Sequence, residues 1–122
     1  SERAHLPGTT RHIGDAYASA HIFAQPSGYE SFGLATAEAM AHGLPAIGFA
    51  NCPGTNQLIR NGENGLLADD KDPVAAFATG LKILMDSPVL REQMGKRAKT
   101  AAEPFHIKKI ADLWENLLYR PK

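Results

Sequence analysis

Hydrophobic residues are arranged along the chain in two ways, as short apolar runs and as repeats at helical spacing. The short runs fall at residues 4–6, 20–25, 45–49 and 66–68, and each lies next to glycine, proline, asparagine or serine. Apolar runs of this length beside turn residues are typical of buried strands. We therefore expect up to four short strands, the first of which rests on only three residues.

The segments between and after these runs favour helix. Residues 34–42 are rich in alanine, leucine and methionine, and Gly43 follows at the point where a helix would end. The apolar and small residues extend nearly all the way round this segment, which predicts a mostly buried helix. Further helices are expected at residues 13–19 and 54–59, after the helix starts Asp72-Pro73 and Ser87-Pro88, and over residues 107–118.

This order of elements predicts an α/β fold. Between residues 20 and 49 a strand, a loop, a helix and a second strand follow one another, which is the repeating unit of a parallel sheet. Residues 1–122 are expected to form one domain, with a strand/helix core over 1–70 and a helical part over 71–122. The predicted architecture is half of a doubly wound sheet.

Two carboxylates stand within the central unit. Glu30 lies in the predicted loop. Glu38 is the only charge on the predicted helix and lies about 40° round it from Leu34, so we expect Glu38 to lie on the packed surface. A buried carboxylate needs a partner, so we expect Glu38 to be hydrogen-bonded. Because the loop enters the helix through Gly33, backbone N–H groups and the positive end of the helix dipole predict an anion site. From the residues alone, a structural role and a binding role remain equally open.

Composition and charge exclude several classes of protein. Thirteen basic residues balance thirteen acidic ones, so nothing indicates a nucleic-acid partner or an anionic membrane. The single cysteine, Cys52, excludes an internal disulfide and fits a reducing compartment. No signal peptide, membrane-length apolar run, nucleophile elbow, zinc spacing or P-loop occurs. The chain has no initiating methionine, and we expect it to be a fragment of a longer protein.

Several motifs resemble family 4 (group 1) of the retaining GT-B glycosyltransferases, and the resemblance runs from about Gly8 to the C-terminus. The motifs are Pro26-Ser27, Tyr29-Glu30-Ser31-Phe32-Gly33-Leu34, Glu38-Ala39-Met40-Ala41, Gly43-Leu44-Pro45 and Asn61-Gly62-Glu63-Asn64-Gly65-Leu66-Leu67. The resemblance implies a three-layer, Rossmann-like parallel sheet that forms the later half of the C-terminal, nucleotide-sugar-binding domain.

The resemblance also implies a role for each site residue. Glu30, the catalytic candidate, would lie beside the donor sugar. The backbone amides of Ser31, Phe32, Gly33 and Leu34 would meet the sugar hydroxyls and the diphosphate. Glu38 would hold the ribose hydroxyls of the nucleotide, and no metal or other cofactor is expected. The family usually has an acidic residue where this chain has Gln57, so a charge-based role at that position is not expected.

The expected function is donor binding in a retaining glycosyltransferase, which moves a sugar from a UDP- or GDP-linked donor to a glycan, lipid-linked or other acceptor. Two alternatives stay open: a non-catalytic nucleotide-sugar-binding or assembly module, and a sugar-nucleotide epimerase of the same architecture. The family's basic pair and the acceptor domain would lie upstream of Ser1, and no Arg or Lys falls between Arg11 and Arg60. The isolated fragment is therefore expected to be inactive. It is also expected to self-associate, because the strand at residues 4–6 would lack its neighbour and the last helix would expose an apolar face. A cytoplasmic location is expected, at the membrane surface or away from it.

Overall fold

The computed structural model describes residues 3–69 and 71–120. Its elements follow the chain as α1 (Ile13–Ser19), β1 (Phe23–Gln25), α2 (Leu34–Ala41), β2 (Ala46–Phe49), α3 (Pro53–Leu58), β3 (Gly65–Ala68), α4 (Pro73–Asp86), α5 (Pro88–Ala102), the 3₁₀ turn η1 (Glu103–Phe105) and α6 (Ile107–Leu118). The helices expected from sequence are all present. The N-caps Asp72 and Ser87 accept hydrogen bonds from the first turns of α4 and α5.

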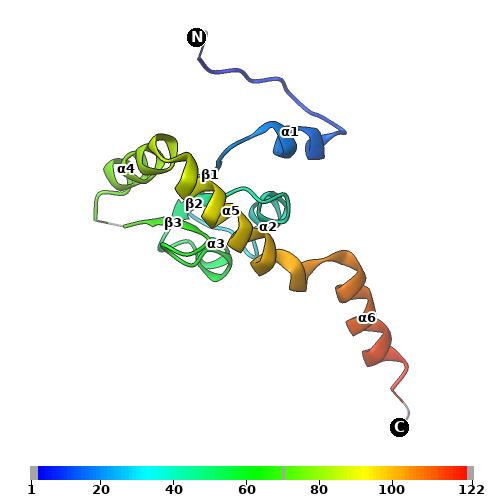
Figure 1. Cartoon of the computed structure of the whole chain (residues 1–122). Helices are drawn as coiled ribbons and strands as arrows, with labels where there is room; N and C mark the ends of the chain where they lie inside the picture. Colours follow the sequence, from blue (N-terminus) through cyan, green and yellow to red (C-terminus); the bar gives the residue numbers. More distant parts are fainter. Residues whose placement is uncertain (1–2, 70, 121–122) are drawn as a thin grey trace.

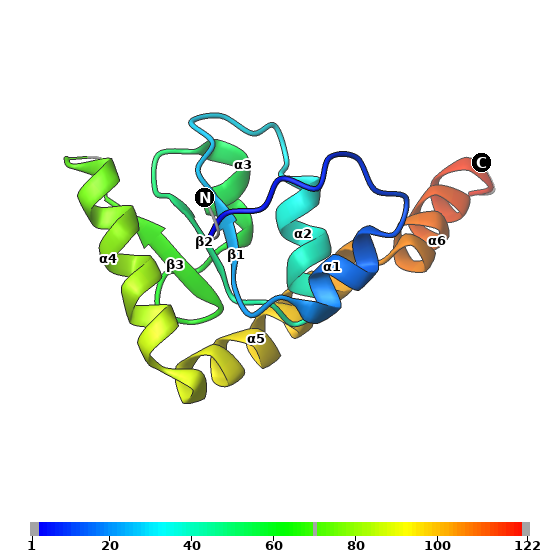
Figure 2. The same cartoon turned by 90° about the horizontal axis from the view of Figure 1, so that it is seen from above.

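The three strands form one parallel sheet in the order β1–β2–β3. Phe23 pairs with Ala46, and Ala46 pairs in turn with Gly65. Parallel neighbours need a crossover, and α2 and α3 supply the two crossovers here. The carboxyl ends of all three strands therefore lie at the same edge of the sheet, as Figure 2 shows.

Helices cover both faces of this sheet. Side chains alternate along β2, so that Ala46 packs with residues of α2, α3 and α5, whereas Ile47 packs against α4. Gly80 lets α4 approach closely, because a Cβ at this position would overlap the side chain of Ile47. Figure 1 accordingly shows α4 on one side of the strands and α2 with α3 on the other. This arrangement is the expected three-layer, Rossmann-like architecture.

Helix α5 joins the two sides of the core. Met94 near its middle packs with Ile47 and Leu84, while Ala98 farther along packs with Met40 of α2. Gly95 lies against the chain reversal after α2, where an added Cβ would overlap a backbone carbonyl oxygen. The helix therefore fixes the C-terminal end of α2 relative to the sheet.

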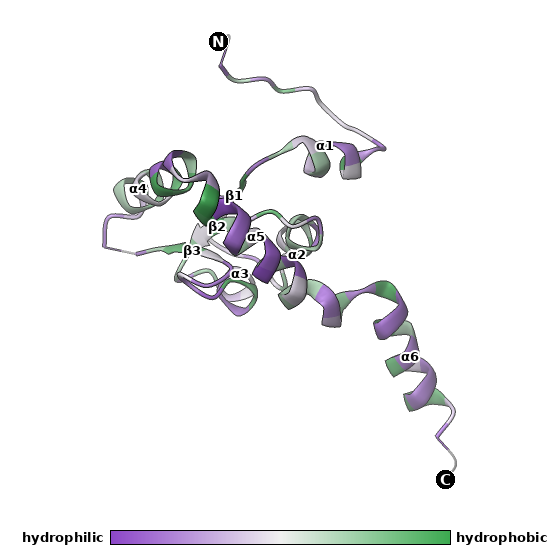
Figure 3. Cartoon of the chain, viewed as in Figure 1, coloured by the Kyte–Doolittle hydropathy of each residue, from purple (hydrophilic) through white to green (hydrophobic). Residues whose placement is uncertain are grey.

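Helix α6 projects away from the core (Figure 1). None of its residues is buried, although it has a strongly apolar side that includes Trp114, Leu117 and Leu118. Figure 3 shows hydrophobic and hydrophilic residues alternating along this helix. An exposed apolar side of this kind marks a surface that normally meets a partner.

The strand expected at residues 4–6 is absent, and that expectation is wrong. The segment is irregular, and Leu6, its only large apolar side chain, is 95% exposed. One apolar residue ahead of Pro7 and Gly8 buries too little surface to offset the entropy lost on ordering. Among the described residues, β1 therefore forms one edge of the sheet.

Candidate functional site

Residues 26–33 connect the carboxyl end of β1 to the start of α2, which is the edge where open α/β sheets bind their ligands. Glu30, in the middle of this loop, is half-buried. Its Oε1 accepts a hydrogen bond from Nε2 of Gln25 at 2.6 Å, and its backbone carbonyl accepts one from the amide of Gly54 at 2.9 Å. Glu30 is therefore held both through its side chain and through its backbone.

The loop enters α2 through Gly33, as expected. Gly33 is buried and has a φ of +87°, a left-handed conformation that glycine adopts without the steric cost of a Cβ. No side chain caps the helix at this point, so the N–H groups of the first turn have no capping partner from the described residues. The start of α2 is accordingly suited to bind an anion.

The residues beside Gly33 differ in how exposed they are. Ser31 and Leu34 are exposed, and Leu34 is 70% exposed, whereas Phe32 is half-buried and packs edge-on against Phe105 at 5.1 Å between ring centroids. The loop thus presents its backbone and two exposed side chains to solvent, while Phe32 attaches it to the turn that precedes α6.

The expectation that Glu38 lies on a packed surface is wrong. Glu38 and Leu34 are both exposed, because the core takes only the opposite side of α2, through Thr36, Ala39 and Met40. Small residues all round the helix made the two sides indistinguishable in sequence. The predicted hydrogen bond is nevertheless present: Oε2 of Glu38 accepts from the hydroxyl of Tyr17 at 3.3 Å.

Tyr17 was not predicted to belong to the site. It lies on α1, is only 8% exposed, and packs with Phe23, Ala39 and Leu44. Burial raises the pKa of its hydroxyl, and the charge of Glu38 and their hydrogen bond raise it further. At neutral pH the hydroxyl is therefore protonated and able to donate to Glu38. The sequence showed Tyr17 only as one residue of an apolar helical pattern.

Two other side chains were also missed. Gln25 closes β1 and reaches forward into the loop, a contact that a strand-forming run gives no reason to expect. Thr36 in the first turn of α2 is fully buried, and its hydroxyl has no hydrogen-bond partner among the described residues. It faces the backbone of Gly33, since a Cβ there would lie 3.6 Å from the Thr36 Oγ1.

A groove of about 550 Å³ runs beside the exposed side of α2. Among the predicted site residues it is lined by Phe32, Leu34 and Glu38, together with residues of α5, η1 and the start of α6. Glu30, Ser31 and Gly33 do not line it. The structure therefore brings three of the six predicted residues to one groove and leaves the other three in the adjoining loop and cap.

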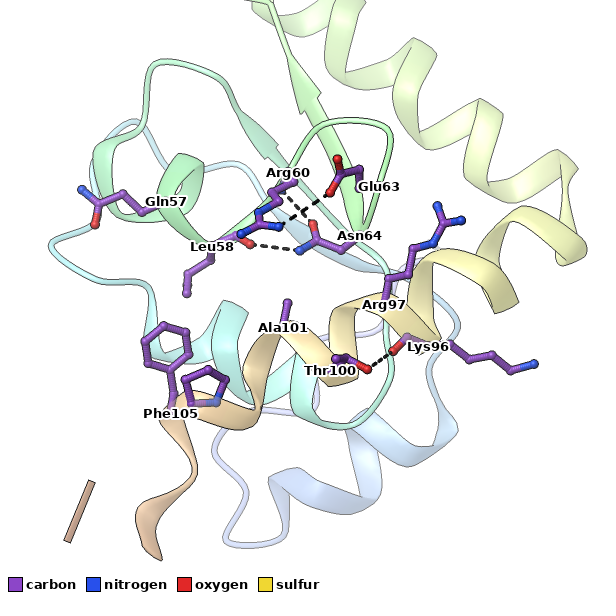
Figure 4. A pocket seen from close by; sticks show the side chains of 11 residues that line it. Gln57, Leu58, Arg60, Glu63, Asn64, Lys96, Arg97, Thr100, Ala101 and Phe105 are labelled. Carbon is purple, nitrogen blue, oxygen red and sulfur yellow. Dashed lines mark hydrogen bonds and ion pairs between the residues drawn. The ribbon is translucent and has the colours of Figure 1, made fainter. Parts of the chain in front are cut away.

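A second hollow, of about 600 Å³, lies between α3, the loop before β3 and α5 (Figure 4). Arg60, Lys96 and Arg97 contribute positive charge to it, and the Arg60 guanidinium lies 3.9 Å from the Glu63 carboxylate. None of the predicted site residues lines this hollow. It is distinct from the loop that carries Glu30 and from the side of α2 that carries Glu38.

Residues 3–69 and 71–120 contain no group of three or more His, Cys, Asp or Glu placed to hold a metal ion. Within the same residues, no single helix is long and apolar enough to cross a membrane. Only one pair of helical segments, Pro73–Asp86 and Pro88–Leu118, has the length and composition of a membrane span when the two are taken together. These two segments are bent by 104° relative to each other. Cys52 is free and fully buried.

The fold is that of GT-B glycosyltransferases, as two solved structures show. The chain superposes on sucrose-phosphate synthase from Thermosynechococcus elongatus with a TM-score of 0.76 and 29% identity, covering 89% of this chain and 27% of that one. It also superposes on the pneumococcal O-GlcNAc transferase GtfA in complex with UDP and GlcNAc, with a TM-score of 0.74 and 26% identity, over 88% and 22% of the two chains.

The chain belongs to the family of glycosyl transferases group 1, whose model matches residues 1–101. A relative described as an uncharacterized glycosyltransferase from Haemophilus influenzae is 34% identical over 109 residues, which is 89% of this chain and 31% of the relative. The chain thus spans about a third or less of the length of these relatives. The expected family and fold are confirmed.

Proposed function

We propose that this chain is the donor-binding part of a retaining glycosyltransferase that transfers a sugar from a nucleotide sugar to an acceptor. The observation that carries the proposal is that Glu30 lies in the loop leading to the uncapped N-terminus of α2, with Glu38 exposed one turn further along the same helix. Family membership supports the class of reaction. The similarity to GtfA, whose structure is a complex with UDP and GlcNAc, supports a nucleotide sugar as the donor class.

Each residue has a part in this proposal. Glu30 contacts the donor sugar, and the amides of residues 31–34 receive sugar hydroxyls and the diphosphate at the positive end of α2. Glu38 accepts from the two ribose hydroxyls, which a carboxylate with free lone pairs can do while Tyr17 occupies one of them. The exposure of Glu38 suits this role, because a ligand can reach the carboxylate without any movement of α2.

Several finer points belong to the proposal. UDP or GDP is the nucleotide, no metal takes part, and the anomeric configuration is retained, with the donor diphosphate assisting as leaving group. An acceptor-binding domain and a basic pair for the diphosphate precede this segment in the full-length protein. The full-length protein is cytoplasmic, either at the membrane surface or away from it. Copies of the isolated segment associate with one another. Neither the assembly-module alternative nor the epimerase alternative has an observation in its favour.

Calorimetric titration of the full-length protein with UDP and with GDP tests the proposal. We expect one of the two to bind, and to bind more weakly when Glu38→Gln is introduced, whereas Glu92→Gln on the exposed side of α5 should leave binding unchanged. If neither nucleotide binds the full-length protein, the proposal is wrong. Proton NMR of the product then reads the anomeric configuration, and an inverted product would contradict the retaining assignment.

A further inference from the structure

Gln25 and Glu30 are joined at the point where β1 passes into the loop. Nε2 of Gln25 lies 2.6 Å from Oε1 of Glu30 and 2.9 Å from Oγ of Ser27, and all three side chains are half-buried. An ionised carboxylate only accepts hydrogen bonds, so the NH₂ group of the amide must face Glu30. The orientation of this amide is therefore determined by its partner.

The backbone of Glu30 is fixed by a different element. Its carbonyl accepts from the amide of Gly54 in the first turn of α3. Gly54 cannot carry a side chain in this position, because a Cβ would lie 2.5 Å from the same carbonyl oxygen. With the backbone held by α3 and Oε1 held by β1, the Oε2 atom has no protein hydrogen-bond partner among the described residues.

The hydrogen-bond donor to the Glu30 carboxylate, the side-chain amide of Gln25, is neutral. A lysine or arginine in the place of Gln25 would neutralise the carboxylate, and residues 12–59 contain neither residue type. The amide instead fixes the direction of the carboxylate, and among the described residues Glu30 makes no ion pair that would neutralise its charge. A charged acceptor with one oxygen fixed and the other without a protein partner is suited to a hydroxyl group that arrives with a ligand.

We propose that Gln25 is a positioning residue, which holds the Glu30 carboxylate so that Oε2 is directed toward a hydroxyl of the donor sugar. This inference rests on the proposed function, in which Glu30 contacts the sugar. It adds that the strand end, rather than the loop alone, determines how tightly the sugar portion is held. Gln25 acts on the sugar through Glu30 and does not act on the nucleotide.

The test compares a nucleotide sugar with its free nucleoside diphosphate in the full-length protein, using the UDP or GDP form that binds. In Gln25→Met the side chain keeps its length but loses the amide group that donates the hydrogen bond to Glu30. We expect the kcat/KM for the nucleotide sugar to fall about tenfold, the loss of one hydrogen bond to a charged group. The dissociation constant of the free diphosphate should stay unchanged, as should both quantities in the control Gln93→Met on the exposed side of α5.

A purely structural role for Gln25 predicts a different result. The amide also holds Ser27, so Ser27→Ala separates the folding of the loop from the orientation of Glu30. If Gln25→Met weakens the free diphosphate and the nucleotide sugar equally, or if Ser27→Ala reproduces its whole effect, the inference is wrong. If Gln25→Met does not fold, Gln25→Glu keeps the shape and places two carboxylates together, and an unchanged kcat/KM in that variant would equally overturn the inference.

The Glu30→Ala variant distinguishes a failure of the proposed function from a failure of the positioning role. Glu30→Ala should lower the kcat/KM for the nucleotide sugar, and in that background Gln25→Met should have no further effect, because the two changes remove the same interaction. If Glu30→Ala leaves the preference for the nucleotide sugar intact, the sugar contact itself is misassigned. If Glu30→Ala has its effect and Gln25→Met has none, only the positioning role is refuted.

Discussion

The hydroxyl of Tyr17 on α1 lies 3.3 Å from Oε2 of Glu38 on α2 and 3.5 Å from the carbonyl oxygen of Ala35. The tyrosine ring is fixed by its contacts with Phe23 and His42, whose ring centroids lie 6.1 Å and 5.1 Å away. A buried side chain on one helix therefore orients an exposed carboxylate on the next. This contact is how Glu38, on the solvent side of α2, keeps a defined direction.

Tyr17→Phe should weaken nucleotide binding by the full-length protein. The change keeps the ring and its packing but removes the hydrogen bond, which costs on the order of 1 kcal/mol in binding or stability. Isothermal titration with UDP or GDP measures the effect, and Tyr119→Phe on an exposed residue after α6 is the matched control. Binding by Tyr17→Phe that equals the wild type would show that Glu38 does not depend on this contact.

Glu38→Gln should reduce donor affinity more strongly. The amide keeps the size of the side chain but loses the charge that makes it a strong acceptor for two ribose hydroxyls, and the expected loss is about 1.5–3 kcal/mol. Because Glu38 is exposed, the melting temperature should change little. Unaltered affinity for the nucleotide would refute the ribose assignment.

Gly33 should not tolerate a side chain. At its φ of +87° any residue with a Cβ is strained. Gly33→Ala should therefore cost about 1–2 kcal/mol of stability and should weaken donor binding. Gly33→Val should abolish donor binding. Below its lowered melting temperature, this variant should still give the circular dichroism spectrum of a folded protein.

Gly28 in the same loop provides the control for that prediction. It has no positive φ, and nothing lies within 4 Å of the Cβ that alanine would add. Thermal denaturation followed by circular dichroism should place Gly28→Ala near the wild type. Normal donor binding by Gly33→Val would show that the start of α2 does not approach the donor.

Stability at alkaline pH should depend on Tyr17. Its pKa is raised in the folded chain, chiefly by burial, so the folded state holds the proton more tightly than the unfolded chain does. The resulting stabilisation is present below the unfolded pKa of about 10 and is lost as the pH rises through the higher folded pKa. Denaturant unfolding from about pH 8 to 11 should show this fall in the wild type and a smaller one in Tyr17→Phe.

The isolated chain should self-associate. Among the described residues β1 is an unpaired sheet edge, and the apolar side of α6 is exposed, with Trp114 at 59% and Leu118 at 69%. Light scattering across a concentration series should show the average mass rising, and Trp114→Glu with Leu117→Lys should suppress the rise. A chain that stays monomeric at the highest concentration would contradict this prediction.

The amino-acid sequence alone determined the order and type of nearly every element. Apolar runs beside turn residues located β1, β2 and β3, and the caps Asp72 and Ser87 located α4 and α5, because these signals act between residues close in the chain. Gly33 was also recognisable, since only a glycine adopts a positive φ there without strain. The resemblance of the loop motifs added the family.

Tertiary structure decided which side of each element meets the core. A helix of small residues such as α2 carries no strong preference, so the exposure of Glu38 depends on where α5 and the sheet pack against it. The partners of the Glu pair depend on the same packing. Tyr17 reaches Glu38 across 21 positions in the chain, and Gly54 reaches Glu30 from α3, contacts that form only once the sheet has brought the helices together.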